Sequence, residues 1–523
     1  MELGEEDVDM SHSGRRAAIR YALGALVTIA LALGTVALSQ GDAQRTLTIA
    51  QGIDPGTFDP FARTTSATWA VLGNVFDALL QRDQDGNLQP SLATDWSTVD
   101  DSTWEFTLRQ GVLWHDGTEF TAEDVAFTLD RARTDETLLR NPAFLPIVEV
   151  EVVDDYTVRV HTDGPYPLLI NEMAQGGSSG ILPRHVFEEL GAANFNTAPI
   201  GTGPYRFVSW VRDDRVVLEA FDDHWRGRAE YDQVVFRVIP EASTRVAEVM
   251  TGGVDIAPGI PPLDVPRVNA SGRAQVVPAP TTRAMMFYVQ FHEDAATSDI
   301  RVRQAIDYAI DNQTLVDVVM GGAGVPVRGL VAPGVTGADM DLYDSYRYDP
   351  ERALELLAEA GYGPGELEIT IQGPHGRYLQ DSDIAEVVGL MLQEVGVKTV
   401  VETMEWSAYR ERVTYNFVEH IALIGLANSS MDAGVALASS YRARMSLRNY
   451  VNPYLGELLD VAEINMNFEE RNEQLREAFA ILDNELPFIY LFNLEDHAAV
   501  SLDVDWMPRI DEQLWAFDAR PRQ

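Results

Sequence analysis

The chain lacks cysteine entirely and contains a single lysine, Lys398, among its 523 residues. Without cysteine it forms no disulfide, thiolate metal site, cysteine nucleophile or lipid-modified cysteine anchor. Basic residues are scarce as well, because 39 lysines and arginines stand against 81 acidic residues and give a formal net charge of −42 at pH 7. Nucleic acid is therefore not an expected partner, since phosphate binding needs a basic surface.

The acidic residues are spread along the chain rather than collected in a tail. Hydrophobic residues make up 46% and charged residues 23%, which is the balance of a globular protein rather than a disordered one. The length allows about three domains of ~150 residues or two large ones. A dispersed acidic surface suits a high-salt habitat, whereas the preference for arginine over lysine also suits a GC-rich genome.

The N-terminal segment has the features of a secretion signal. Arginines at positions 15, 16 and 20 precede an apolar run over residues 21–38, which small residues follow in "ALSQGDAQ". We therefore expect a signal peptide over residues 1–43 and a periplasmic or extracellular location. The first ten residues are acidic, so Met10 is a candidate for the true start. An uncleaved single-span anchor is the alternative, since the run is close to the minimum length of a membrane span.

Strand patterns alternate with helix patterns along the chain, which predicts a mixed α/β fold. The spacing of apolar residues predicts one helix over residues 64–81 and a second that begins after Thr121, with Asp124 in its first turn. Asp349 is expected to cap a further helix that has Pro350 at its first position. Two extended segments, residues 276–291 and 487–497, are candidates for strands that cross between lobes.

Two glycine-rich stretches are similar to short motifs of nucleotide-binding proteins and of serine hydrolases. "GTGPYRF" has Arg206 where a dinucleotide fingerprint needs glycine, and Pro204 removes a backbone donor, so a turn into a strand is expected there. Gly201 and Gly203 are expected to adopt backbone conformations that other residues resist. "GGSSG" formally matches the serine hydrolase elbow around Ser178, but Pro183 interrupts the helix that should follow. A secreted serine hydrolase is therefore a remote alternative.

The nine histidines lie too far apart in sequence for a zinc motif, and with 81 acidic residues carboxylate pairs occur everywhere by chance. We therefore expect no metal site, no cofactor and no catalytic residues.

Five segments that follow one another along nearly all of the mature chain resemble the extracellular solute-binding proteins of family 5. These are the peptide- and nickel-type receptors of ABC importers. The segments are "TLTIAQGIDPGTFDP", "PSLATDWSTVDDSTWEFTLRQGVLWHDGTEFTAEDVAFTLDRA", "PIGTGPYRFVSW", "IRVRQAIDYAID" and "YDPERALELLAEAGY".

The resemblance implies a periplasmic-binding-protein-like fold of two α/β lobes joined by two crossing strands. Lobe I would span residues 44–280, with an extra subdomain at about 86–195, and lobe II residues 281–488, before the chain returns to lobe I over 489–523. Such a protein is not an enzyme. It encloses a small solute between its lobes and delivers it to an ABC permease and its ATPase, and it touches the membrane only through the permease or an uncleaved N-terminal segment. We expect a monomer.

The resemblance also indicates ligand-binding residues. In peptide-binding relatives a lobe II aspartate pairs with the α-ammonium group of the peptide, and Ser429 stands at that position in "GLANSSMDAG". Asp432 then substitutes for that aspartate, or the ligand has no free amine there, because a buried ammonium without a carboxylate is costly. Asn428 lies beside them, and Arg377 in "GPHGRYLQD" matches an arginine that some dipeptide binders offer to the ligand carboxylate.

Further candidate contacts are three residues of the first crossing strand and two tryptophans that stack on a sugar ring or line a side-chain pocket: Arg283, Met286, Tyr288, Trp406 and Trp69. The sequence thus predicts a receptor for a peptide-class solute. The alternative is the same fold binding an oligosaccharide or another non-peptide solute.

Overall fold

The computed structural model describes residues 44–62, 65–414, 418–428, 430–441 and 450–522. Residues Thr46–Gln523 form one compact unit. The expected signal peptide and Ser429 lie outside the described residues, so the predictions for them stay predictions.

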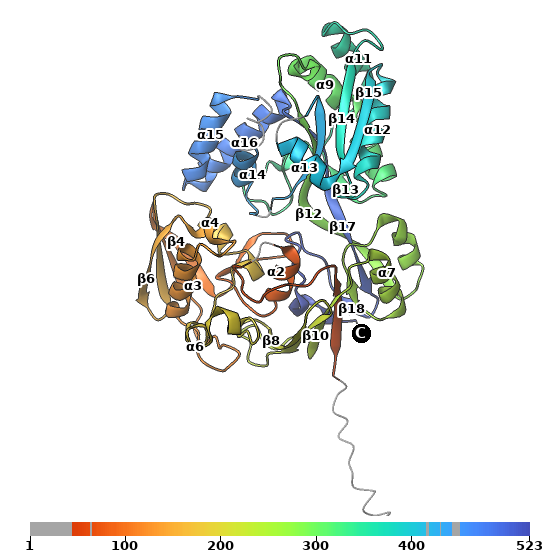
Figure 1. Cartoon of the computed structure of the whole chain (residues 1–523). Coiled ribbons are helices and arrows are strands. Elements are labelled where there is room, and N and C mark those ends of the chain that lie inside the picture. Colours follow the sequence, from red (N-terminus) through yellow and green to blue (C-terminus); the bar gives the residue numbers. More distant parts are fainter. Residues whose placement is uncertain (1–43, 63–64, 415–417, 429, 442–449, 523) are drawn as a thin grey trace, which may run out of the picture. The chain divides into compact units, whose positions relative to one another are not determined.

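One long mixed sheet runs through this unit (Figure 1). At its centre β12 (Ala274–Val289) and β17 (Phe488–Ser501) pair antiparallel from Ala274 opposite Ser501 to Tyr288 opposite Phe488. On one side of this pair lie β16 (Ile421–Leu426), β14 (Glu368–His375) and β15 (Lys398–Glu405), and β13 (Gly324–Pro326) also pairs with β17. On the other side lie, in order, β11 (Ile256–Ala257), β1 (Thr46–Gln51), β10 (Gln233–Val238), β9 (Arg215–Ala220) and β8 (Tyr205–Val211).

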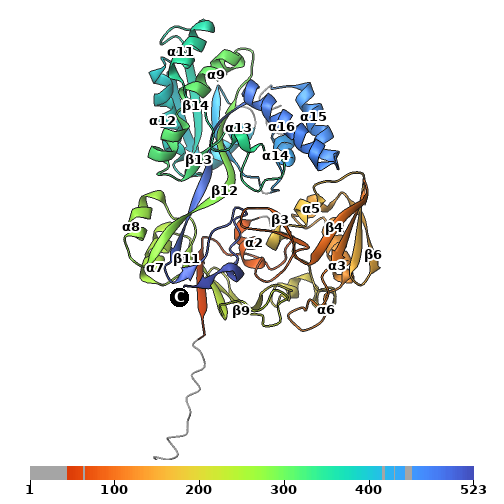
Figure 2. The same cartoon turned by 180° about the vertical axis from the view of Figure 1, so that it is seen from behind.

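β12 and β17 cross from one lobe into the other, as both cartoon views show (Figures 1 and 2). Lobe I carries β1 and β8 to β11, and lobe II carries β14 to β16. The predicted two-lobed α/β fold with two crossing strands is therefore confirmed. The expected lobe boundaries at 280/281 and 488/489 fall inside β12 and at the start of β17.

Lobe I contains a second, antiparallel sheet with the order β4 (Ala93–Asp100), β5 (Thr103–Leu108), β7 (Thr157–Thr162) and β6 (Ile147–Asp154). Trp104 and Phe106 of β5 are buried in the lobe I core. α3 (Ala122–Thr134) begins where the sequence predicts, because the Asp124 carboxylate accepts a hydrogen bond from Thr121 N at 3.0 Å. The other elements of the lobe are α2 (Ser66–Leu72), β2 (Leu80–Arg82), β3 (Leu88–Pro90), α4 (Asn141–Phe144), α5 (Leu169–Glu172), η1 (Gly176–Ser178), α6 (Arg184–Phe195), α7 (Ala242–Thr251), α8 (Val265–Asn269), β18 (Val504–Asp505) and β19 (Arg520–Pro521).

The helix predicted over residues 64–81 is much shorter in the structure, where α2 ends at Leu72. The following backbone carbonyls are needed elsewhere: Asn74 O accepts from Tyr205 N at 3.0 Å, and Val75 O accepts from Gly203 N at 2.9 Å. A continued helix would direct these carbonyls into its own hydrogen bonds. The apolar residues do have helical spacing, but those that follow Leu72 belong to a buried turn.

The contact with Val75 also explains Gly201 and Gly203, for which the sequence predicted backbone conformations that other residues resist. A Cβ on Gly201 would lie 1.8 Å from Val75 O, and one on Gly203 would lie 2.6 Å from Val75 C. Neither has a positive φ. Glycine is needed at both positions because the backbone here touches the backbone at Val75. His115 stabilises the turn by accepting a hydrogen bond from Gly201 N at 3.1 Å.

In lobe II helices cover the parallel strands on both faces (Figures 1 and 2). α11 begins as predicted, since Asp349 accepts from Arg352 N at 2.9 Å and Pro350 occupies the first position. Lys398, the single lysine, is exposed at the start of edge strand β15. The main helices are α9 (Ile300–Ala309), α11 (Pro350–Glu359), α12 (Asp381–Glu394), α13 (Trp406–Thr414), α14 (Ala433–Ser440), α15 (Pro453–Ile464) and α16 (Phe468–Glu485). Across the described residues no helix combines the length and apolar character needed to cross a membrane.

Candidate functional site

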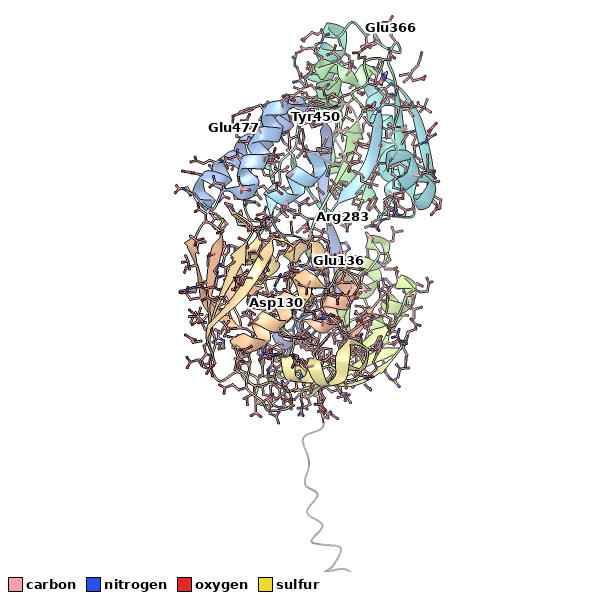
Figure 3. All side chains as sticks on the ribbon, turned by 60° about the vertical axis from the view of Figure 1, so that its left-hand side comes forward. Asp130, Glu136, Arg283, Glu366, Tyr450 and Glu477 are labelled. Atoms are coloured by element: carbon pink, nitrogen blue, oxygen red, sulfur yellow. The ribbon has the colours of Figure 1, made fainter. Side chains whose placement is uncertain are left out.

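A cavity of about 460 Å³, here called the interlobe cavity, lies between the lobes at the crossing strands. Figure 3 shows Arg283 of β12 at this junction. The cavity brings together three of the residues predicted from sequence: Trp69 from lobe I, Arg283 from the crossing strand and Asn428 from lobe II. Its other lining residues are Arg82, Arg140, Ala174, Gln175, Thr282, Ala427, Met431, Ile510, Asp511, Glu512 and Gln513.

A second cavity of about 340 Å³, the hinge cavity, adjoins the first and shares Arg283, Glu512 and Gln513 with it. Its wall is mostly apolar and comes from lobe I and the crossing strands. Asp496 of β17 also lines it, and burial raises the pKa of this carboxyl group above its usual range. The two cavities therefore meet at Arg283, Glu512 and Gln513.

The arginines of the interlobe cavity differ in their partners. Arg82, at the end of β2, is 4% exposed and donates to Gly86 O at 2.6 Å and to Asn171 Oδ1 at 2.8 Å. Burial lowers its pKa to about 10. Arg140 donates to Glu172 Oε2 at 2.5 Å, and its guanidinium lies 5.9 Å from the centre of the Trp69 ring.

The lobe II wall is the loop that follows β16. Asn428 N donates to Thr282 Oγ1 at 3.1 Å, which ties this loop to the crossing strand. The Asn428 side chain donates to Asp432 O at 3.1 Å and accepts from Ser430 Oγ at 2.8 Å. These hydrogen bonds hold Asn428 against the crossing strand and against Asp432.

Asp432, the predicted substitute for an ammonium-binding aspartate, does not line either cavity. It forms a buried two-point ion pair with Arg471, at 2.7 and 2.9 Å. It also accepts from Val435 N at 3.1 Å, which caps α14, and from Asn171 Nδ2 of lobe I at 3.3 Å. Its carboxylate oxygens are therefore already bonded to Arg471, to the start of α14 and to Asn171 of lobe I.

The other predicted contacts also lie outside both cavities. Met286 and Tyr288 are fully buried in the lobe II core. Arg377 is exposed, and its guanidinium lies 5.2 Å from the centre of the Trp406 ring. This pair follows β14 and β15 at the sheet edge where the carboxyl ends of the parallel strands meet, the edge from which the 427–431 loop also emerges.

Ser178 does not have the geometry of a hydrolase nucleophile. It is fully buried in η1, and its hydroxyl donates to Gln175 O at 3.0 Å. In the described residues on either side of it, no strand leads into it and no helix follows directly. Within the described ranges, no three histidine or carboxylate side chains gather as a metal site would require.

The lobes also touch beside the cavity. A Cβ on Gly334 of lobe II would lie 2.6 Å from Gly86 Cα of lobe I and 2.2 Å from Asp85 O. Both glycines have positive φ, 71° and 85°. Any larger residue at position 334 would push this contact apart.

Two lobes on crossing strands with a lined cavity between them define a hinge-closing solute-binding protein. Residues 87–444 match the family model described as "Bacterial extracellular solute-binding proteins, family 5 Middle". The chain belongs to this family, as its sequence motifs predicted, and members of the family are solute-binding receptors of ABC importers rather than enzymes. The hydrolase alternative is therefore rejected.

Two curated relatives and one solved structure illustrate the similarity. The glutathione-binding protein GsiB of Salmonella paratyphi A is 30% identical over 367 residues, which is 69% of this chain and 70% of that protein. The dipeptide-binding protein of Escherichia coli K12 is 28% identical over 417 residues, or 74% and 77% of the two chains. The structure of HbpA2 from Haemophilus parasuis matches with a TM-score of 0.81 at 22% identity, covering 91% of this chain and all of the other.

Sequence reasoning missed Arg82 and Arg140. Each is a single basic residue that follows two leucines closely, in "ALLQRDQ" and "TLLRNPAF". A charged residue at the end of an apolar run is a usable signal, because an arginine seldom becomes buried without a role. Nothing in the sequence indicates that these two segments meet.

Proposed function

We propose that this chain is the secreted receptor of an ABC importer, that it captures a peptide-class solute between its lobes as a monomer, and that it delivers the solute to a membrane permease. The observation that carries the proposal is the interlobe cavity, which is lined from both lobes and from β12. Its volume of about 460 Å³ lies within the range of small-ligand pockets, about 300–1,000 Å³. Relatives that bind glutathione and dipeptides support the peptide class.

Within this site we assign Trp69, Arg283 and Asn428 as ligand contacts. Trp69 offers an aromatic face in lobe I, Arg283 a cation at the hinge and Asn428 the lobe II wall. Asp432, Met286 and Tyr288 are assigned to the framework, because they are buried and engaged there.

Isothermal titration with di- to octapeptides tests the peptide class directly. We expect binding without turnover, and weaker binding by Trp69→Ala. Trp210→Ala is the matched control, because Trp210 packs against Phe58 and does not line either cavity. Failure of every peptide, together with binding of another solute, would reject the peptide class.

A non-peptide solute is the second candidate, and one observation favours it. The only aspartate in the segment that matches the ammonium-binding region, Asp432, is already paired with Arg471. Titration with oligosaccharides of increasing length distinguishes the two candidates, since a sugar receptor would bind these and ignore the peptides.

A further inference from the structure

We propose that the solute carries a carboxylate and that Arg82, Arg140 and Arg283 receive it in the interlobe cavity. The inference rests on the proposed function, because it names the chemistry of the solute that the same cavity takes. Three elements supply the arginines: the end of β2, the residue before α4, and the crossing strand β12.

Arg82 is a buried cation whose acceptors are neutral. Its guanidinium donates to one carbonyl and one amide oxygen, and no carboxylate among the described residues lies within ion-pair distance of it. The carboxylates of Asp511, Asp432, Asp83 and Glu172 act on it only at longer range, and burial lowers its pKa. Taking a cation out of water is costly unless an anion meets it. An acidic solute would supply that anion.

Arg140 retains an unused donor. Its Nη2 pairs with Glu172, whereas its Nε is buried and has no hydrogen-bond acceptor. A buried N–H without an acceptor costs free energy. It stays available for a ligand oxygen that enters beside Trp69.

Arg283 is the cation at the hinge. It lines both cavities, and in the described part of the chain its guanidinium makes no ion pair or hydrogen bond. Because it lies on a strand that crosses between the lobes, it meets a solute in either cavity.

The carboxylates of the wall do not cancel these charges. Asp511 accepts from Arg509 at 2.7 and 3.0 Å, so it is already paired, and Glu512 is the other acidic residue of the lining. Among the residues that line the cavity, three guanidiniums stand against two carboxylates. This local excess of positive charge stands in a chain whose net charge is −42.

A carboxylate suits this site because its two oxygens match the forked donors of a guanidinium. The test uses matched acids and amides: trialanine against trialanine amide, which differ in one carboxylate, and succinate against succinamide, which differ in two. Inorganic phosphate is included to separate a carboxylate from any anion. Affinities are measured by isothermal titration and by the shift in Tm.

In each pair that binds, we expect the affinity of the acid to be at least about tenfold higher than that of its amide. This is the effect of one pair of charge-assisted hydrogen bonds. Arg283→Gln should reduce that preference to about threefold or less, whereas Arg283→Lys should keep part of it. Arg82→Gln should act in the same direction, with folding checked by circular dichroism. Arg352→Gln, on the exposed face of α11, is the matched control and should leave the preference unchanged.

Equal affinity for acid and amide, or no binding by any carboxylate probe, overturns the inference. Phosphate binding as tight as that of the carboxylates overturns the assignment to a carboxylate. Neutral peptides that bind as well as acidic ones remove this inference but leave the peptide receptor standing. Succinate binding without any peptide binding would reject the peptide receptor and leave this inference standing.

Discussion

Arg471 holds both carboxylate oxygens of Asp432, at 2.7 and 2.9 Å, and neither side chain is more than 1% exposed. This pair joins α16 to the start of α14, directly behind the wall of the interlobe cavity. Asp432, which the sequence offered as a substitute for the ammonium-binding aspartate, therefore stabilises the lobe II wall of the site.

Asp432→Asn should destabilise the protein by about 3–5 kcal/mol, because it leaves the Arg471 charge buried without a partner. Urea denaturation followed by circular dichroism measures this loss. The double variant Asp432→Leu/Arg471→Met should lose less than Asp432→Asn alone, since no buried charge remains. Equal losses in the two variants would contradict the ion-pair argument.

Gly334→Ala should weaken solute binding by roughly tenfold or more, because the added Cβ overlaps Gly86 where the lobes meet and such overlaps cost about 1–3 kcal/mol. Gly111→Ala is the matched control: Gly111 has the same φ of 71° as Gly334, but a Cβ there would meet no atom within 4 Å. Isothermal titration measures affinity, and small-angle scattering measures how far the lobes close. If both variants lose affinity equally, backbone strain rather than contact between the lobes is the cause.

His115 should make stability depend on pH. Burial lowers its pKa to about 4, and its Nδ1 accepts from Gly201 N, so the folded protein holds it neutral. In the unfolded chain its pKa is about 6.5. Stability from this group is complete above about pH 6.5 and is lost as the pH falls toward 4, by up to about 1.4 kcal/mol per pH unit.

Urea unfolding at pH 7, 6 and 5 tests this, with His115→Gln as the comparison. The variant should lose less stability than the parent chain over this interval. Parallel pH profiles would show that groups other than His115 set the dependence.

Ala279→Trp should fill the hinge cavity, which Ala279 lines opposite Asp496. If longer solutes extend there from the interlobe cavity, their affinity should fall about tenfold or more, while that of the shortest ones stays unchanged, because indole adds a large buried volume. Titration with peptides of increasing length measures the difference, and Ala279→Ser controls for the change of residue. A uniform loss across all lengths would contradict the division into two cavities.

The sequence predicted the fold well where local patterns and tertiary packing agree. The capped starts at Thr121 and Asp349 and the two crossing strands depend on short-range signals, and the structure has them. The long helix over residues 64–81 was wrong, because the carbonyls of Asn74 and Val75 bond to a segment more than a hundred residues away. Apolar spacing alone does not encode such a partner.

The site was harder to predict for the same reason. Trp69, Arg283 and Asn428 line one cavity, and their role as ligand contacts stays a prediction. Arg82 and Arg140 come from short loops whose meeting depends on the packing of the whole lobe. No periodicity or motif in the sequence indicates that these two segments meet.

The exposed lysine at the start of β15 gives the molecule an unusual chemical asymmetry. An amine-reactive dye has one side-chain target, Lys398, and that target lies on an edge strand of lobe II. One cysteine introduced on lobe I would then be the only thiol in the chain. Two different fluorophores could thus be attached by orthogonal chemistry, so that energy transfer between them follows the separation of the lobes in single molecules.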